Sequence, residues 1–438
     1  MKHIKLNKVL ILFGIIAAFV SFISCEDKNK NTGDSAAPVI KAIYLEDANS
    51  SVPDRLVDFA RLGQTIRIEG ESLLGVNKLT INGYECLFNP ALMTNTSMFI
   101  QISNKVPTID ASEDVRNKIR LDKGSQYCIY NFEIRAAAPS ITTVSHTMAQ
   151  AGDEITITGN GLQEVSQVLF PGNIPGAKIS SDDVDGKWCK VTVPAGITTS
   201  GSISVTCANG GVYSPPYFNY KEGMLHNFDD VQNYSWGSGI DNTALTALIP
   251  ASGNCKSQGG YQVFNSGGNL GAGADQRFWL NSDKIMPIMQ NLPNLPLTTL
   301  TNQCGIQMDI YVEGTWNSGI IRFAVADGYG STRYAMVYQP VYPGGSSYDA
   351  TAFVNPGEWF TITLPFSDSP DFQGKTLGDV IAQMVAAAYH QSGPWFENSG
   401  IKDVFDPIAA TQKIYFDNIR IVPLSAPTYS DFPDDTTK

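Results

Sequence analysis

A stretch of about ten residues occurs twice in this chain, at positions 64–73 and again at 153–162, an offset of 89 positions. An offset of this length corresponds to a domain and is too long for a solenoid repeat. In the first copy Ile66 and Ile68 alternate with polar residues, and Ile155 and Ile157 do so in the second. Such alternation is typical of a half-buried strand. The repeat therefore predicts two β domains of the same kind in tandem.

The two copies share further signals. Pro38 and Pro139 each open an alternating run, where proline protects an edge strand and marks a domain joint. Gly70 and Gly159 follow the isoleucines, and we expect them to allow the turn that comes next. Several short strands separated by turn residues within such a length predict an Ig-like sandwich.

This succession of a proline-opened strand, an isoleucine run, a glycine and a later valine and glycine resembles the IPT/TIG family of Ig-like domains. The resemblance predicts one domain at 38–137 and a second at 138–221. Members of that family are usually spacers, so we expect no binding site in either unit.

The net charge of the chain limits the classes of molecule that it is expected to bind. Lys and Arg number 30 against 42 Asp and Glu, a formal net charge of −12. An acidic protein repels phosphate backbones, which argues against nucleic acid, and the net field disfavours anionic glycans more weakly. The 39 Gly and 24 Pro favour many short strands and turns over helices.

The N-terminus predicts the compartment. Three lysines (Lys2, Lys5 and Lys8) precede an apolar run at 9–23 that is short for a membrane-spanning helix. Residues 22–25 resemble a lipobox, although Phe22 stands where leucine is usual. We expect residues 1–24 to be a lipoprotein signal peptide and Cys25 to be lipidated. An ordinary signal peptide is the alternative.

A lipidated tether at 25–37 is expected next, because these residues are small and polar. The pair Glu26-Asp27 resembles the surface-export signal of Bacteroidota lipoproteins. With the three early lysines removed, the mature chain has a net charge of −15. The predicted location is the outer membrane, facing outward.

The remaining cysteines fall two to each predicted domain. They are Cys86, Cys128, Cys189, Cys207, Cys255 and Cys304. Three disulfides within domains are compatible with an oxidising compartment, and so are six buried thiols. Their spacing does not fit a zinc site.

Residues 222–438 form the third predicted domain. Strand-like runs lie at 304–312, 319–326, 333–339, 359–364 and 413–422, and a helix-like run at 377–389. High β content in a unit of this size predicts a jelly-roll sandwich. The whole chain is therefore expected to be all-β.

This third domain holds five of the six tryptophans. Aromatic rings match the apolar faces of neutral sugars, and loops are where sandwich domains place ligand contacts. Trp359 lies mid-strand and is expected in the core, while Trp279 is ambiguous. The residues expected to bind glycan are Trp236, Trp316, Trp395, Tyr329, Tyr334, Tyr338 and Tyr342.

Three acids near the ends of this domain could supply calcium ligands. Asp229, Asp230 and Asp417 offer hard oxygens, as in carbohydrate-binding jelly rolls whose first and last strands hold a structural calcium. The competing interpretation, which we favour, is that they are ordinary turn and strand-edge acids. We predict no other metal and no cofactor.

A lipobox, tandem IPT/TIG units and a terminal aromatic-rich jelly roll together resemble the surface glycan-binding proteins of Bacteroidota polysaccharide-utilisation loci. The resemblance implies non-catalytic capture of a neutral polysaccharide beside a TonB-dependent transporter and its lid lipoprotein. Xyloglucan, mixed-linkage glucan, xylan and mannan stay open.

Two other classes of function remain. A glycoside hydrolase would need two carboxylates across a cleft. The available acids, none in a recognisable catalytic pair, are Glu313, Asp327, Asp349, Glu358 and Glu397. A protein-binding adhesin could also be built from tandem Ig-like units, but adhesion does not require a concentration of tryptophans.

Overall fold

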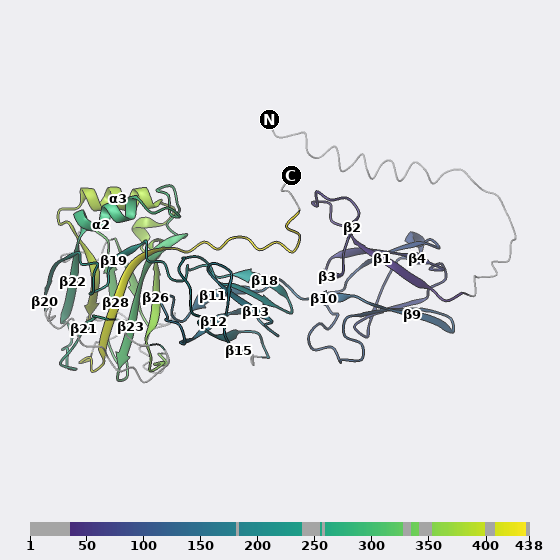
Figure 1. The fold of residues 1–438 in the computed structure, drawn as a ribbon, viewed down its shortest axis with the longest axis horizontal. Coiled ribbons are helices and arrows are strands. Elements are labelled where there is room, and N and C mark those ends of the chain that lie inside the picture. The colour runs from purple at the N-terminus through teal and green to yellow at the C-terminus, as the bar shows by residue number, and fades with distance from the viewer. Residues whose placement is uncertain are drawn as a thin grey trace, which may run out of the picture.

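The computed structural model describes residues 36–180, 184–238, 255, 259–326, 334–340, 353–398 and 408–434. It is an all-β chain of three sandwiches arranged in a row (Figure 1). Within the described residues no helix is long and apolar enough to cross a membrane.

The first sandwich packs two four-stranded sheets, with a short parallel pair beside them. One sheet has the order β2-β1-β4-β7 and contains β1 (Val39–Leu45), β2 (Arg55–Leu56), β4 (Thr65–Glu71) and β7 (Ser97–Gln101). The other has the order β6-β5-β8-β9 and contains β5 (Lys78–Ile81), β6 (Tyr84–Cys86), β8 (Lys118–Lys123) and β9 (Gln126–Asn131). The parallel pair is β3 (Phe59–Arg61) and β10 (Glu133–Arg135).

The second sandwich also packs two four-stranded sheets. The first, β11-β12-β16-β15, contains β11 (Ser140–Val144), β12 (Glu154–Asn160), β15 (Ile179–Ser180) and β16 (Trp188–Thr192). The second, β14-β13-β17-β18, contains β13 (Gln167–Phe170), β14 (Ile174–Pro175), β17 (Ser204–Cys207) and β18 (Gly210–Tyr213).

The sequence repeat corresponds to one shared structural feature, a bulge where the first strand meets the isoleucine strand. The register shifts between Ile40 and Ala42 in the first sandwich and at the equivalent place in the second. A Cβ on Gly70 would lie 1.8 Å from the Val39 carbonyl oxygen, and one on Gly159 would lie 1.8 Å from that of Ser140. The glycines are needed for this close backbone approach inside a strand, and our expectation that they allow a turn is wrong.

The terminal sandwich packs two five-stranded sheets. The inner sheet has the order β19-β28-β23-β26, with β21 also paired to β28, and contains β19 (Met224–His226), β21 (Gln262–Phe264), β23 (Cys304–Glu313), β26 (Phe360–Pro365) and β28 (Lys413–Pro423). The outer sheet has the order β20-β22-β27-β24-β25 and contains β20 (Tyr234–Ser238), β22 (Asp275–Asn281), β24 (Ile320–Ala324), β25 (Ala335–Tyr338) and β27 (Gln391–Glu397). The five predicted strands of this domain are confirmed.

Two helices pack together at one end of the terminal sandwich (Figure 1). The helix expected at 377–389 is α3 (Leu377–Ala386), which begins at a capping box between Thr376 and Asp379. The other, α2 (Ser282–Gln290), was not expected. It carries Pro287 inside it, and the Asn281 side chain caps its N-terminus.

The second and terminal sandwiches share a buried interface. Trp359 is buried as predicted, but in the hydrophobic cluster of the second sandwich, beside Tyr261 and Tyr311. A main-chain hydrogen bond also crosses the interface, because the Thr361 N–H donates to the Ser145 carbonyl at 2.8 Å. These contacts hold the two sandwiches in one orientation.

All six described cysteines are free thiols, so the disulfide alternative is wrong. Cys255 packs in the hydrophobic cluster of the second sandwich and Cys304 in that of the terminal sandwich. Burial raises the pKa of Cys189 and of Cys304 to about 12. These thiols act as small buried hydrophobes.

Candidate functional site

The outer sheet of the terminal sandwich carries tryptophans on the side that faces away from the core. Along β22 the residues Phe278 and Leu280 enter the core, so Trp279 between them points outward. Along β27 the same argument places Phe396 inside and Trp395 outside. We call this outward side the tryptophan face.

Strand pairing brings the residues of this face together. Trp236 of β20 lies opposite Trp279, and Trp395 lies between Arg277 and Arg322 on the two neighbouring strands. The tryptophan face therefore consists of Trp236, Arg277, Trp279, Arg322, Trp395 and Glu397.

The three indoles differ in exposure. Trp236 is 41% exposed, whereas Trp279 and Trp395 are 0% and 4% exposed and pack with Ala324 and Ala335 in a small cluster separate from the main core. The indole N–H groups of Trp279 and Trp395 have no hydrogen-bond partner within the described part of the chain. An unpaired buried donor is costly, and such donors often belong to functional sites.

Two ion pairs order the polar groups of the face. The Arg277 guanidinium lies 4.9 Å from the centroid of the Trp395 ring and 2.6 Å from an Asp275 oxygen. Arg322 forms an ion pair with Glu397 across β24 and β27. Each arginine has an acidic partner, so the face offers hydrogen-bond donors and acceptors with little net charge.

This combination suits a neutral sugar. Indole rings pack against the C–H faces of pyranose rings, while guanidinium and carboxylate groups bond to equatorial hydroxyls. Trp236 is the exposed ring of the three. Trp279 and Trp395 are buried beside it on the neighbouring strands.

The structure contradicts the exposure expected for Trp316 and Trp395. Trp316 lies inside the main core at 0% exposure, and its indole N–H donates to the Gly319 carbonyl at 2.9 Å. A loop tip rich in glycine and asparagine suggested a surface residue, but the chain folds this ring back between the two sheets. Trp395 stays on the tryptophan face, although buried.

The tyrosines divide differently from the expectation. Tyr334 is half-buried against the core and 5.5 Å from the Phe372 ring, and Tyr338 packs on Trp316 at 5.9 Å. Neither belongs to the tryptophan face. Tyr329, Tyr342 and Cys25 lie outside the described residues.

Four residues of the face were not predicted to bind glycan, among them Glu397, which was weighed only as a carboxylate for hydrolysis. Trp279 was left ambiguous, and Arg277 and Arg322 were not considered. The strict alternation of Arg277 and Trp279 with Phe278 and Leu280 was the available signal, because it places the first pair on the opposite side of the strand from the second.

Each of the three possible calcium ligands accepts a hydrogen bond within the chain. Asp229 accepts a hydrogen bond from the Gly260 N–H at 2.6 Å, and Asp230 bonds with Asn227 in an exposed turn. Asp417 is buried, and this burial raises its pKa well above the usual value. Among the described residues no group of three or more acidic, histidine or cysteine side chains could hold a metal ion.

The carboxylates weighed for hydrolysis are engaged elsewhere. Glu313 accepts hydrogen bonds from Lys413 and from the Tyr415 hydroxyl, both at 2.8 Å, and the Lys413 contact is the main cause of its lowered pKa. A general acid needs a raised pKa, so Glu313 does not suit that role. Glu358 accepts from the Cys255 N–H at 3.4 Å, and Glu397 pairs with Arg322. Asp327 and Asp349 lie outside the described residues.

A β-sandwich with an aromatic sheet face, joined to Ig-like units, is the architecture of a modular carbohydrate-binding protein. Residues 218–423 match the family of surface glycan-binding protein B xyloglucan binding domains, and residues 139–220 match the IPT/TIG domain family. The resemblance expected from the sequence is confirmed for these two segments.

Two relatives extend this comparison. An IPT/TIG domain-containing protein of Bacteroides ovatus is 28% identical over 218 residues, which cover 46% of this chain and 43% of that protein. The chain thus spans less than half the length of this curated relative. The crystal structure of the surface glycan-binding protein PbSGBP-B from Prevotella bryantii is 18% identical, with a TM-score of 0.57 over 89% of this chain and all of that one. This second likeness supports the three-sandwich fold.

Proposed function

We propose that this protein binds a neutral β-glucan on its tryptophan face and holds it without cleaving it, with xyloglucan as the first candidate. The observation that carries the proposal is the alignment of Trp236, Trp279 and Trp395 on adjacent strands of one sheet. Trp236 is 41% exposed and can therefore contact a β-linked chain directly, while the buried Trp279 and Trp395 pack beside it on the neighbouring strands. The family matched by residues 218–423 is named for xyloglucan binding, which selects this glucan from the candidates.

The remaining parts of the proposal concern place and partners. Lipidation of Cys25 would anchor the chain in the outer membrane, and the first two sandwiches would raise the tryptophan face above it. The captured polysaccharide would pass to a TonB-dependent transporter and its lid lipoprotein. The surface glycan-binding family supports a position at the cell surface.

The test is calorimetric titration of the purified protein with xyloglucan, mixed-linkage glucan, xylan and mannan. We expect heat with xyloglucan and no new reducing ends after prolonged incubation. Trp236→Ala should weaken binding by about 5- to 10-fold, since an exposed ring contact is worth roughly 1 kcal/mol. The matched control is Trp188→Ala, a half-buried tryptophan of β16 in the second sandwich, which should bind like the parent.

The outcomes separate clearly. Equal affinity of the parent and Trp236→Ala would remove the tryptophan face as the site. Silence of the folded protein with all four polysaccharides would contradict glucan binding itself, and release of oligosaccharides would make the protein a hydrolase.

A further inference from the structure

We propose that the groove between the second and terminal sandwiches is a second saccharide-binding site, distinct from the tryptophan face. The inference rests on the proposed glucan binding and extends it to a new position. The groove, here called the junction groove, has a volume of about 680 Å³. Ligand pockets in proteins are of this size and often lie at domain interfaces.

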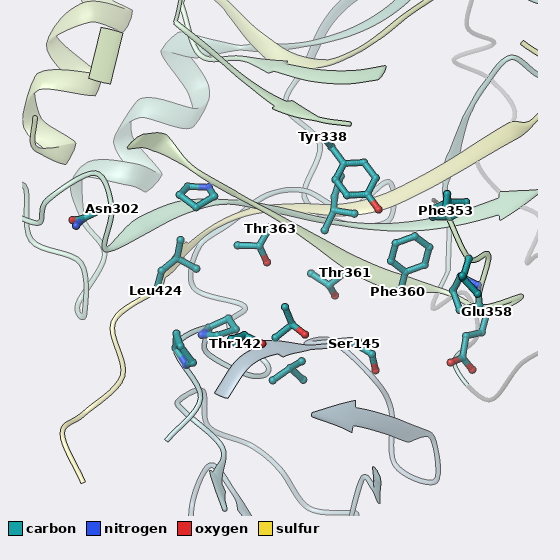
Figure 2. A pocket seen from close by; sticks show the side chains of 18 residues that line it. Thr142, Ser145, Asn302, Tyr338, Phe353, Glu358, Phe360, Thr361, Thr363 and Leu424 are labelled. Atoms are coloured by element: carbon teal, nitrogen blue, oxygen red, sulfur yellow. The ribbon is translucent and has the colours of Figure 1, made fainter. Parts of the chain in front are cut away.

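One side of the junction groove is aromatic. Figure 2 shows Tyr338, Phe353 and Phe360 grouped along it. The Phe353 and Phe360 rings lie 6.2 Å apart, and the buried Trp316 lies behind, 5.5 Å from Phe353 and 5.9 Å from Tyr338. All three lining rings are only half-buried, so they combine rigid support with accessible surface.

The rest of the lining offers hydroxyl and amide groups. Thr142 lies on the opposite wall, and Thr363 and the exposed Asn302 extend the groove away from the rings (Figure 2). The Thr363 hydroxyl accepts from the Gln307 amide at 2.9 Å and retains its own proton for donation. The Thr142 hydroxyl donates to the Thr158 carbonyl at 3.1 Å and retains its lone pairs.

The chemistry of the lining selects a neutral saccharide. The described lining residues include no lysine or arginine, and Glu358 is the acid among them, so an anionic ligand is disfavoured. Burial raises the pKa of Tyr338 to about 12, so its hydroxyl stays neutral and able to donate. Rings for C–H faces beside hydroxyls and an amide for sugar hydroxyls match a saccharide better than a lipid or a peptide.

The groove is formed before any ligand arrives. The Thr361 N–H donates to the Ser145 carbonyl at 2.8 Å, and the Thr147 N–H donates to the Thr361 hydroxyl at 3.0 Å. These bonds fix the two walls, which belong to different sandwiches. A preformed site avoids the ordering cost that weakens binding to a surface made of separate parts.

The junction groove also adjoins the sheet of the tryptophan face. Its residue Tyr338 ends β25, the edge strand of that sheet, and Phe360 begins β26, the edge strand of the inner sheet. The groove thus lies where both sheets of the terminal sandwich meet the second sandwich.

The test is the stoichiometry of binding of xyloglucan heptasaccharide and of cellohexaose to the full-length protein. Two oligosaccharides per chain are expected. Thr363→Lys places a charged chain in the groove at an exposed strand position and should leave one binding event. Combination with Trp236→Ala should weaken that remaining event by about 5- to 10-fold. Phe360→Ala should weaken the groove event at least fivefold, and Tyr127→Ala, an exposed ring of the first sandwich, is the matched control.

The two proposals fail in different ways. One oligosaccharide per chain, with both groove variants equal to the parent, would overturn the junction groove and leave the tryptophan face intact. Binding that is abolished by Thr363→Lys and indifferent to Trp236→Ala would support the groove and remove the face. Unchanged thermal unfolding of the variants shows that each loss arises at the site.

Discussion

Single side chains in the terminal sandwich take their roles from the direction in which they point. Trp316 and Trp236 have the same chemistry, yet one fills the space between two sheets and the other is 41% exposed on the outside of one. Trp316 contacts the aromatic rings of Tyr338, Phe353 and Phe396. Its role is packing, and it also supports the aromatic wall of the junction groove.

Trp316→Ala should therefore destabilise the protein. Removing a fully buried tryptophan leaves a cavity and costs about 3–5 kcal/mol. Denaturant unfolding of the variant against the parent measures this loss, with Trp236→Ala as the exposed counterpart that should change stability by less than about 1 kcal/mol. A Trp316→Ala protein as stable as the parent would contradict the core position of this ring.

His226 gives the stability of the protein a pH dependence. Its ring is buried between Phe228 and Phe278, and its Nδ1 accepts the Asn233 N–H at 2.9 Å. Burial lowers the pKa of His226 to about 4, against about 6.5 in an unfolded chain. Between pH 4 and 6.5 the folded state binds fewer protons than the unfolded state. The contribution of the neutral His226 to stability is therefore complete above pH 6.5 and is lost as the pH falls toward 4.

At pH 4 the loss from His226 should amount to roughly 3 kcal/mol. Unfolding at pH 7, 5.5 and 4 should show the decline, and His226→Gln should flatten it. Burial also lowers the pKa of His146, which leaves a residual slope of the same sign. The control His390→Gln changes an exposed histidine. Parallel curves for the parent and His226→Gln would refute the assignment.

At the scale of elements, β28 and β23 carry a buried ion pair into the interface with the second sandwich. The Arg420 guanidinium contacts Asp309 at 2.9 Å and donates to the Thr147 hydroxyl at 2.8 Å. Burial alone would raise the pKa of Asp309, but Arg420 and His146 outweigh it and the net shift is downward. The buried ion pair of these two strands thus also bonds to Thr147 of the second sandwich.

Arg420→Met should cost about 3–5 kcal/mol, because it leaves Asp309 buried without its counter-charge. Arg420→Lys should recover only part, since an ammonium cannot reproduce the two-pronged guanidinium contacts. The matched control is Arg120→Met, whose pair with Asp122 at 2.7 Å is exposed and screened by solvent, so its loss should change stability far less. Equal effects of Arg420→Met and Arg120→Met in denaturant unfolding would show that burial of the pair is unimportant.

Alternation and strand length were enough to predict the strands of the terminal sandwich, because both are local properties. The helix α2 escaped prediction because Pro287 argues against a helix interior, while the cap at Asn281 is a weak signal. Which side of the sheet a strand tryptophan occupies depended on the register of its strand to within one residue. The position of Trp316 depended on how its loop folds back. Cysteine pairing depended on which strands become neighbours. None of these properties is local, so the tryptophan face was only partly predicted.

At the scale of the whole molecule, the end of the chain connects all three sandwiches. Residues 424–434, here called the C-terminal strap, leave β28 and run along the second sandwich to the first (Figure 1). Tyr429 lies 6.0 Å from Tyr213 of β18, and Phe432 stacks on Phe59 of β3 at 5.4 Å. The strap thus crosses the junction between the first and second sandwiches, which the buried interface around Trp359 does not reach.

Ion pairs hold the strap on the first sandwich. Arg61 contacts Asp431 at 2.7 Å and also donates to the Asn209 carbonyl of the second sandwich at 2.9 Å. Arg55, which is buried, contacts Asp434 at 2.7 Å and lies over the Phe432 ring. Arg61 thus joins three parts of the chain, and we expect the strap to fix the angle between the first two sandwiches.

Deletion of residues 425–438 should therefore free the first sandwich to reorient without unfolding the other two. Small-angle X-ray scattering should show a broader distribution of interatomic distances. Glucan affinity should be unchanged, because the deletion retains Leu424, which lines the junction groove, and the tryptophan face lies outside the strap. A deletion of 435–438 alone keeps every described contact and serves as the control. Asp431→Asn with Phe432→Ala should reproduce the longer deletion. Scattering curves that superpose for all four proteins would mean that the angle is set elsewhere, because the strap would then follow the arrangement of the sandwiches without determining it.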